Sequence, residues 1–148
     1  MYLTREADYA VRCVLFLSRK ADRMASTAEI SKAALIPRGF LAKILQRLAK
    51  TGIVASTKGA AGGFRLSMLP EEVSLLDVIE ALQGPFAINA CAVDEKACDL
   101  AGACAVHPVW VELRQEMEER LKEETFAKLI KREKDGLPGA RRAHRADQ

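Results

Sequence analysis

Apolar residues recur at helical spacing in three blocks of the first 52 residues, and short polar or proline-containing stretches separate these blocks. Thr4 can cap a first helix, and Ser26 begins a capping box for a second helix over residues 27–34. Pro37 can begin a third helix, which Gly52 ends as a C-cap. This pattern predicts three short consecutive helices that bury their apolar faces against one another.

A different pattern follows the third helix. Residues 53–57 and 64–67 are short and β-prone, and the glycine-rich segment 58–63 joins them. We therefore predict a β-hairpin with a mobile tip. Three helices followed by a two-stranded wing is the order of a winged helix-turn-helix, which we assign to residues 1–84, so the predicted fold is mostly α with a small β-hairpin.

A fourth helix and an irregular segment follow the hairpin. Ser74 begins a capping box for a helix over residues 75–82, and Gly84 closes this helix. Residues 85–105, here called the cysteine segment, show neither a helical nor a strand period. We predict that they form a loop.

A long helix with one apolar stripe is predicted over residues 108–123. The stripe consists of Trp110, Leu113, Met117 and Leu121. Because such a helix lies outside the compact part of the chain, we predict that residues 106–132 pair with a second copy to form a homodimer. The alternative is that the stripe belongs to the internal core. Residues 133–148 are polar and basic, and we predict that this tail is disordered.

Charge is unevenly distributed along the chain, although the net charge is only +3. Residues 30–70 contain seven basic residues and no acidic one, whereas residues 71–130 contain thirteen acidic and five basic residues. Ordinary solvated helix surfaces are the alternative, but an acid-free basic stretch favours binding to double-stranded DNA. The candidate DNA-binding residues are Arg38, Lys43, Gln46, Arg47, Lys50, Lys58 and Arg65.

Three of the four cysteines lie in the cysteine segment, and a histidine follows them. They are Cys91, Cys98 and Cys104, followed by His107. Three thiolates and one imidazole suit zinc or, with sulfide, an iron–sulfur cluster. The six and five residues between the cysteines exceed the C-x2-C spacing of structural zinc sites, which favours the larger iron–sulfur group. Thiol redox chemistry and chance clustering are the alternatives.

The fourth metal ligand has two candidates. Pro108 favours an extended conformation for His107, which would turn the imidazole toward the cysteine segment; the alternative is that His107 caps the long helix. Asp8 is the rival ligand, although a carboxylate near a helix N-terminus usually complements the positive end of the helix. Cys13, at helical spacing, is predicted to be a small buried residue.

Other classes of protein are disfavoured. No apolar run approaches the roughly 18 residues of a membrane span. The first residues lack the layout of a signal peptide, so we expect a cytoplasmic protein with reduced thiols. No serine or cysteine nucleophile has a visible base partner, and the wing glycines lack the order of a P-loop. We therefore predict that the protein is not an enzyme.

Four sequence blocks resemble the IscR/NsrR/RirA family of iron–sulfur winged-helix transcriptional regulators. The blocks are Leu3-Thr4-x-x-x-Asp8-Tyr9-Ala10-x-Arg12, Phe40-Leu41-x-Lys43-Ile44-Leu45-x-x-Leu48, Lys58-Gly59-x-x-Gly62-Gly63-Phe64-x-Leu66 and the three spaced cysteines. They occur in this order and cover residues 1 to about 130. The resemblance implies a dimeric bacterial transcription factor whose operator binding changes with a cluster on these cysteines.

The resemblance also implies a choice of cluster. IscR-type members use a histidine three residues after the third cysteine, matched here by His107, and bind a 2Fe–2S cluster. NsrR-type members use an aspartate of the other subunit, matched by Asp8, with a 4Fe–4S cluster that reacts with nitric oxide. We favour His107 and 2Fe–2S. The chain departs from the IscR pattern at Ala42, where that group has a glutamate, and at Lys58, where arginine is more usual.

These observations predict a homodimeric transcriptional regulator, and we favour a repressor, that reads a palindromic operator and senses iron, redox state or nitric oxide through an iron–sulfur cluster. A regulator controlled by zinc or by thiol oxidation is the first alternative. A cluster-carrying protein–protein adaptor is the second.

Overall fold

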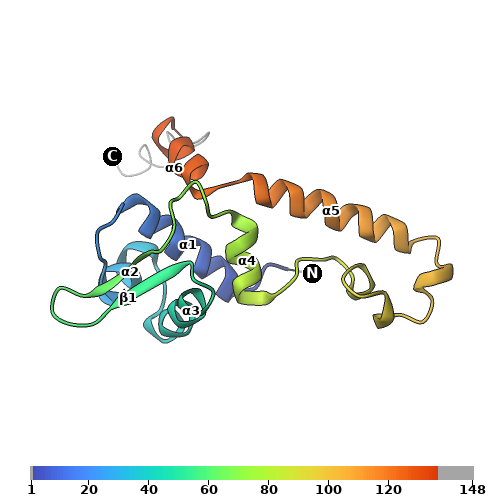
Figure 1. The fold of residues 1–148 in the computed structure, drawn as a ribbon, viewed down its shortest axis with the longest axis horizontal. Helices are drawn as coiled ribbons and strands as arrows, with labels where there is room; N and C mark the ends of the chain where they lie inside the picture. Colours follow the sequence, from blue (N-terminus) through green and yellow to red (C-terminus); the bar gives the residue numbers. More distant parts are fainter. Residues whose placement is uncertain (1, 137–148) are drawn as a thin grey trace, which may run out of the picture.

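The first half of the chain contains three helices followed by a hairpin, in the computed structural model, which describes residues 2–136 (Figure 1). The elements are α1 (Arg5–Arg19), α2 (Thr27–Ala34), α3 (Arg38–Lys50), β1 (Val54–Thr57) and β2 (Gly63–Leu66). The strands are antiparallel, with Val54 opposite Leu66 and Thr57 opposite Gly63. The predicted order of a winged helix-turn-helix, mostly α with one small hairpin, is confirmed.

The second half of the chain contains α4 (Leu75–Gln83), the short 3-10 turns η1 (Ala90–Ala92), η2 (Glu95–Ala97) and η3 (Ala101–Ala103), and the helices α5 (His107–Glu123) and α6 (Phe126–Lys134). The cysteine segment and α5 form an arm that extends from the body, whereas α4 and α6 pack on the body (Figure 1). The cysteine segment folds at the far end of α5, and α5 returns toward the body, where α6 packs on α1.

The predicted disordered tail begins too early. Helix α6 continues through Lys134, beyond the predicted boundary at residue 133. An ion pair joins this last turn to α1, with 2.5 Å between Nη2 of Arg19 and a carboxylate oxygen of Glu133. The rest of the predicted tail, residues 137–148, lies outside the described residues.

Hydroxyl side chains cap the starts of four helices. They are Thr4, Ser26, Ser74 and Thr125. Each accepts a hydrogen bond from a backbone N–H of the first turn that has no partner within its helix. At α4 the capping box is complete, since Asp77 accepts from the Ser74 backbone N–H at 2.8 Å. These local bonds explain why the observed helices begin where the sequence places them.

One hydrophobic core joins α1, α2, α3, α4, the hairpin and α6. Its largest fully buried side chains include Phe126, Leu17, Ile30, Ile36, Leu41, Ile44, Leu45 and Leu48. Burial of each such side chain stabilises the fold by about 1.5–3 kcal/mol. Cys13 lies in this core, as predicted, and burial raises the pKa of its thiol to about 12.

The hairpin is attached to the body at its base. The backbone of Phe64 exchanges two hydrogen bonds with Ala25, at 2.9 and 2.8 Å, between α1 and α2. Gly63 has a φ of +144°, and a Cβ there would lie 2.5 Å from the Ala25 carbonyl oxygen. Glycine is therefore required at this position, because the two backbones approach too closely for a side chain.

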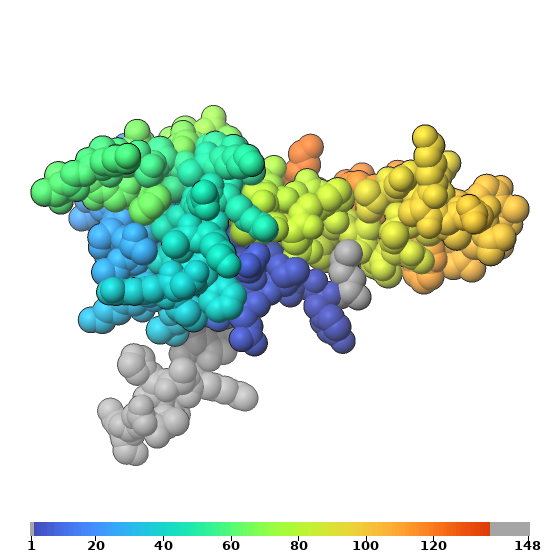
Figure 2. Space-filling model, turned by 90° about the horizontal axis from the view of Figure 1, so that it is seen from below, coloured from blue at the N-terminus to red at the C-terminus, as the bar shows by residue number. Residues whose placement is uncertain are grey.

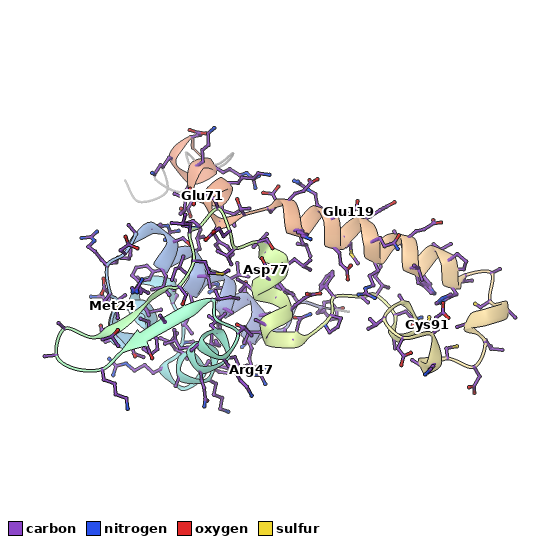
Figure 3. All side chains as sticks on the ribbon, viewed as in Figure 1. Met24, Arg47, Glu71, Asp77, Cys91 and Glu119 are labelled. Atoms are coloured by element: carbon purple, nitrogen blue, oxygen red, sulfur yellow. The ribbon has the colours of Figure 1, made fainter. Side chains whose placement is uncertain are left out.

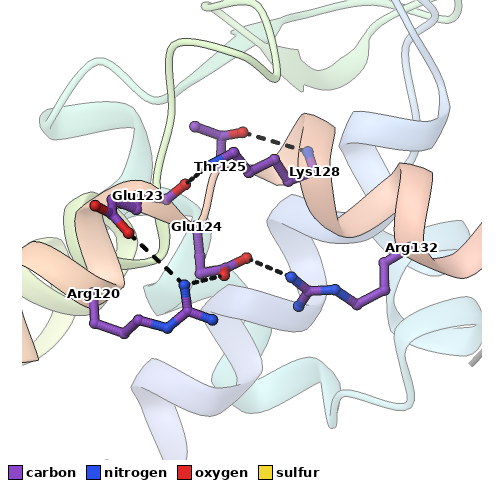
Figure 4. A network of polar contacts seen from close by, with 6 residues as sticks. All are labelled: Arg120, Glu123, Glu124, Thr125, Lys128 and Arg132. Atoms are coloured by element: carbon purple, nitrogen blue, oxygen red, sulfur yellow. Dashed lines mark hydrogen bonds and ion pairs between the residues drawn. The ribbon is translucent and has the colours of Figure 1, made fainter. Parts of the chain in front are cut away.

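The segment between α5 and α6 is joined to the start of α4, and we call this contact the α5–α6 joint. The backbone N–H of Leu75 donates to the Glu124 carbonyl at 2.9 Å, and Ser74 forms an antiparallel bridge with Thr125. The buried Glu124 carboxylate pairs with Arg120 at 2.7 Å and with Arg132 at 2.9 Å (Figure 4). The near end of the arm is thus fixed to the body.

No helix within residues 2–136 has both the length and the apolar character needed to cross a membrane.

Candidate metal centre and nucleic-acid interface

One face of α3 carries three exposed polar side chains, here called the outer stripe: Lys43, Gln46 and Lys50. They recur at i, i+3 and i+7, so they share the face of the helix opposite the buried leucines and isoleucine. Figure 2 shows α3 and the hairpin on one side of the molecule. The side chains of Arg38, Lys58 and Arg65 are also exposed.

The chemistry of the outer stripe suits the major groove of DNA. A lysine ammonium can contact phosphate oxygens or the acceptor atoms of guanine, and a glutamine amide can pair with the edge of adenine. No acidic residue occurs between residues 30 and 70 to repel phosphate. A helix on a buried apolar base with such a stripe fits the reading head of a winged helix-turn-helix.

Arg47 differs from the other candidate DNA-binding residues. Its Nη1 donates to the Leu82 carbonyl oxygen of α4 at 2.6 Å and lies 3.5 Å from the carboxylate of Glu6 in α1. Two turns earlier on the same flank of α3, Phe40 packs edge-on against Tyr9 of α1, with ring centroids 5.5 Å apart. Arg47 is exposed like the other candidates, but its guanidinium also contacts α4 and α1, so this flank of α3 is attached to both helices.

The cysteine segment brings its three thiols to the far end of the arm. Cys91 is buried in η1, whereas Cys98 and Cys104 are half-buried, and all three are free thiols. Within residues 2–136, no three side chains of the histidine, cysteine, aspartate and glutamate types are gathered closely enough to hold a metal ion. The thiols therefore share one segment without converging on a single point.

Arg114 of α5 holds the turn that contains Cys91. Its Nη1 donates to the Ala92 carbonyl oxygen at 2.8 Å, and its Nε donates to Glu118 at 2.7 Å. Glu80 of α4 lies near this group: burial, and secondarily the negative charge of Glu118, raise the pKa of Glu80. These contacts hold the turn of Cys91, which Figure 3 labels in the arm, against α5.

His107 is buried where the cysteine segment meets α5. Its backbone N–H donates to the Cys104 carbonyl at 3.3 Å, and its Nε2 lies 3.7 Å from a carboxylate oxygen of Glu95. Its Nδ1 is the one buried side-chain nitrogen or oxygen in residues 2–136 that has no hydrogen-bond partner. Such an atom is costly unless it is satisfied by a ligand.

The structure excludes the alternative role of His107 as a helix cap and corrects the predicted conformation of its backbone. The residue does not cap α5, because the N-cap position belongs to Val106 and no side chain caps this helix. Nor is its backbone extended, since His107 is the first helical residue. Proline disfavours a helical predecessor without forbidding it, and here Val109 and Trp110 both donate backbone hydrogen bonds to the Val106 carbonyl.

Asp8, the rival ligand, is engaged within α1. Its carboxylate pairs with Arg12 one turn later at 2.7 Å, and the Arg12 guanidinium also lies over the ring of Tyr9. Asp8 stands in the first turn of α1, where a negative charge complements the positive end of the helix. Both observations match the structural interpretation of this residue.

The apolar stripe of α5 is only partly covered. Trp110, Leu113, Met117 and Leu121 are all half-buried, and His107 is the only residue of α5 that is fully buried. Further exposed apolar side chains occur in the cysteine segment and at the start of α5: Ile88, Val93, Leu100, Val106 and Val109. The arm thus presents apolar surface of the kind that a partner covers.

Comparison with known proteins gives a consistent picture. Residues 3–132 match the family model Rrf2, described as an iron-dependent transcriptional regulator. The HTH-type transcriptional regulator NsrR of Bacillus subtilis (strain 168) is 27% identical over 137 residues, which cover 91% of this chain and 94% of that protein.

Two solved structures share the fold. The structure of T. potens IscR superposes with a TM-score of 0.75 and 21% identity, covering 93% of this chain and 92% of that chain. The structure of CymR, the global cysteine regulator of B. subtilis, superposes with a TM-score of 0.71 and 22% identity, covering 87% of this chain and 95% of that chain.

Proposed function

Since the chain belongs to the Rrf2 family of transcriptional regulators, we propose that it is a homodimeric repressor whose operator binding is controlled by an iron–sulfur cluster on Cys91, Cys98, Cys104 and His107. The DNA-binding part of this proposal rests on α3 and the hairpin. The outer stripe reads base edges in the major groove, while Lys58 and Arg65 contact the backbone.

The observation that carries the cluster assignment is the unsatisfied Nδ1 of buried His107, at the end of a segment that contains three free thiols. Three sulfur donors and one imidazole nitrogen form a donor set that fits a 2Fe–2S cluster. A bound cluster would supply a centre that responds to iron supply, to oxidants or to nitric oxide. Because the four donors do not converge in the protomer, loading requires η1, η2 and η3 to close together, and this closure is the proposed switch.

The uncovered stripe of α5 supports the homodimer. A second copy laid along Trp110, Leu113, Met117 and Leu121 would cover half-buried apolar surface on both protomers. It would also hold two copies of α3 at the fixed separation that a palindromic operator demands. A change at the far end of the arm would then alter that separation.

A second function is favoured by the same geometry, namely control by zinc or by thiol oxidation without a cluster. The thiols are free and unconverged, and the chain shares its fold with CymR, a cysteine regulator. In this case oxidation or zinc binding would close the segment instead.

Anaerobic purification separates the two. We expect brown protein with iron and acid-labile sulfide in equal amounts, and a change in affinity for its DNA when the cluster is removed. Serine substitution at Cys98 is expected to abolish both the colour and the change in affinity. If the protein is colourless, contains no sulfide and changes its DNA binding only with oxidants, then thiol oxidation and not a cluster controls DNA binding.

A further inference from the structure

The end of α4 lacks a cationic residue of its own. The last turn of α4 contains no basic side chain, although the final carbonyl groups of a helix have no partner within it and carry partial negative charge. Gly84 donates to the Glu80 carbonyl, but the Leu82 carbonyl is left for another donor. Arg47 of α3 supplies that donor, at 2.6 Å.

The same point of the fold is attached to α1. The Gln83 side-chain oxygen accepts a hydrogen bond from the Thr4 backbone N–H at 3.0 Å, and Glu6 lies 3.5 Å from the Arg47 guanidinium. Three helices therefore meet at the last turn of α4. The chain continues from there through Gly84 and the buried Ala87 into the cysteine segment, and Cys91 follows Leu82 by nine residues.

Arg47 is poorly placed for DNA compared with its neighbours. It lies on the flank of α3 that also carries Phe40, and both of its partners are groups of this chain. Lys43 and Gln46 are exposed, and no hydrogen bond within residues 2–136 engages either side chain. The Arg47 guanidinium therefore connects α3 to α4 and α1, whereas the side chains of Lys43 and Gln46 make no such connection.

We propose that Arg47 is a positioning residue that couples the end of α4, and through it the cysteine segment, to the recognition helix α3. The proposal rests on the proposed function, because it requires that the state of the cysteine segment changes DNA binding. When closure of the segment moves residues 84–91, the Leu82 carbonyl carries Arg47 and α3 with it.

The test compares two substitutions of the same kind, Arg47→Gln and Lys43→Gln. Each variant is prepared anaerobically with its iron and sulfide and again after their removal. Both forms are titrated with a duplex that the wild-type protein selects from a random DNA library, at several salt concentrations. The ratio of the two affinities measures coupling, and the dependence on salt counts phosphate contacts.

For R47Q we expect the two affinities, with and without iron and sulfide, to differ by a factor about fivefold or more smaller than in wild type. We expect the salt dependence of R47Q to equal that of wild type. For K43Q we expect both forms to weaken by the same factor and the salt slope to fall by about one. A salt slope for R47Q that falls as in K43Q, or a ratio equal to that of wild type, overturns the coupling role.

Failure of the proposed function has a different signature, because the wild-type ratio itself would then equal one. If R47Q does not fold, the same titrations are made with Arg47→Lys. Lysine keeps the charge but lacks the planar guanidinium whose Nη1 contacts both Leu82 and Glu6, so we expect a smaller change in the same direction. An R47K ratio equal to that of wild type would then overturn the proposal.

Discussion

The two ends of α5 are held in different ways. At the Glu123 end, the α5–α6 joint combines backbone hydrogen bonds, a carboxylate buried between two guanidiniums and the fully buried Phe126. At the His107 end, Arg114 bonds to the first of three 3-10 turns, apolar side chains are exposed, and a buried imidazole nitrogen lacks a partner. One end resembles the interior of a domain, and the other resembles a surface that needs a partner.

This difference shows where a ligand can act. A group that binds only the closed cysteine segment stabilises the closed conformation, and tighter binding stabilises it more. The effect on hydrogen exchange is greatest where the metal-free protein opens most easily. The joint has no unsatisfied buried polar side chain within the described residues, whereas the far end has His107. A cluster would therefore order the far end, while the joint keeps the other end of α5 fixed to the body.

The largest effect is expected from deleting the buried ring at the joint. Phe126→Ala should lower the free energy of unfolding by about 4 kcal/mol, because it removes a fully buried aromatic side chain. Leu100→Ala is the matched change at the far end, where the side chain is 68% exposed, and should cost under about 0.5 kcal/mol. Urea unfolding of metal-free protein measures both, and equal losses would remove the contrast between the two ends.

Removal of the joint carboxylate should have the next largest effect. Glu124→Ala deletes a buried acceptor of two charged hydrogen bonds and should cost about 2 kcal/mol. Glu95→Ala is the control, because that side chain is 82% exposed at the far end and should leave stability nearly unchanged. Urea unfolding measures the loss of stability in both variants. If Glu124→Ala lowers the free energy of unfolding as little as Glu95→Ala does, the account of the joint is contradicted.

Loss of the Arg114 contact should be local. Arg114→Gln removes the hydrogen bond to the Ala92 carbonyl, which we expect to cost about 1 kcal/mol and to speed amide hydrogen exchange in residues 88–106. Arg120→Gln, whose side chain is 67% exposed, serves as the control and should leave that segment unchanged. Faster exchange throughout α1 in Arg114→Gln would mean that the contact supports the whole fold instead.

The smallest effect concerns pH at the contact of α6 with α1. Hydrogen bonding to Arg19 lowers the pKa of Glu133 in the folded state, so this pair stabilises the protein above the ordinary pKa of glutamate and loses its effect as the pH falls through the lowered value. The difference between wild type and Glu133→Gln should be about 0.5 kcal/mol at pH 7 and should shrink below about pH 4. Thermal unfolding across this range measures it; a difference independent of pH would argue against the ion pair.

Local signals in the sequence predict the elements well but not the contacts between them. Ser26 and Ser74 mark the starts of α2 and α4 because each cap involves residues only three positions apart. Arg47 and Arg114 bond to carbonyls 35 and 22 residues away, and no periodicity reveals such partners. His107 shows the same limit: its helical backbone depends on bonds to Cys104 and Val106 that outweigh the preference imposed by Pro108.

The candidate site was predictable in its chemistry only. The cysteine pattern predicts Cys91, Cys98 and Cys104 as donors and places them in a segment without a regular period. That the thiols remain apart in the protomer depends on the packing of three 3-10 turns beneath α5. The contact of Arg114 with the Ala92 carbonyl contributes to this packing and lies outside any sequence motif.

The central claim is that a cluster orders the far end of α5 and leaves the joint unchanged. Amide hydrogen exchange of the full chain, compared between protein loaded anaerobically with iron and sulfide and the same protein after their removal, tests it directly. We predict slower exchange in the loaded protein over residues 88–107 and no change at residues 123–127. Equal exchange in both forms over residues 88–107 would contradict the claim.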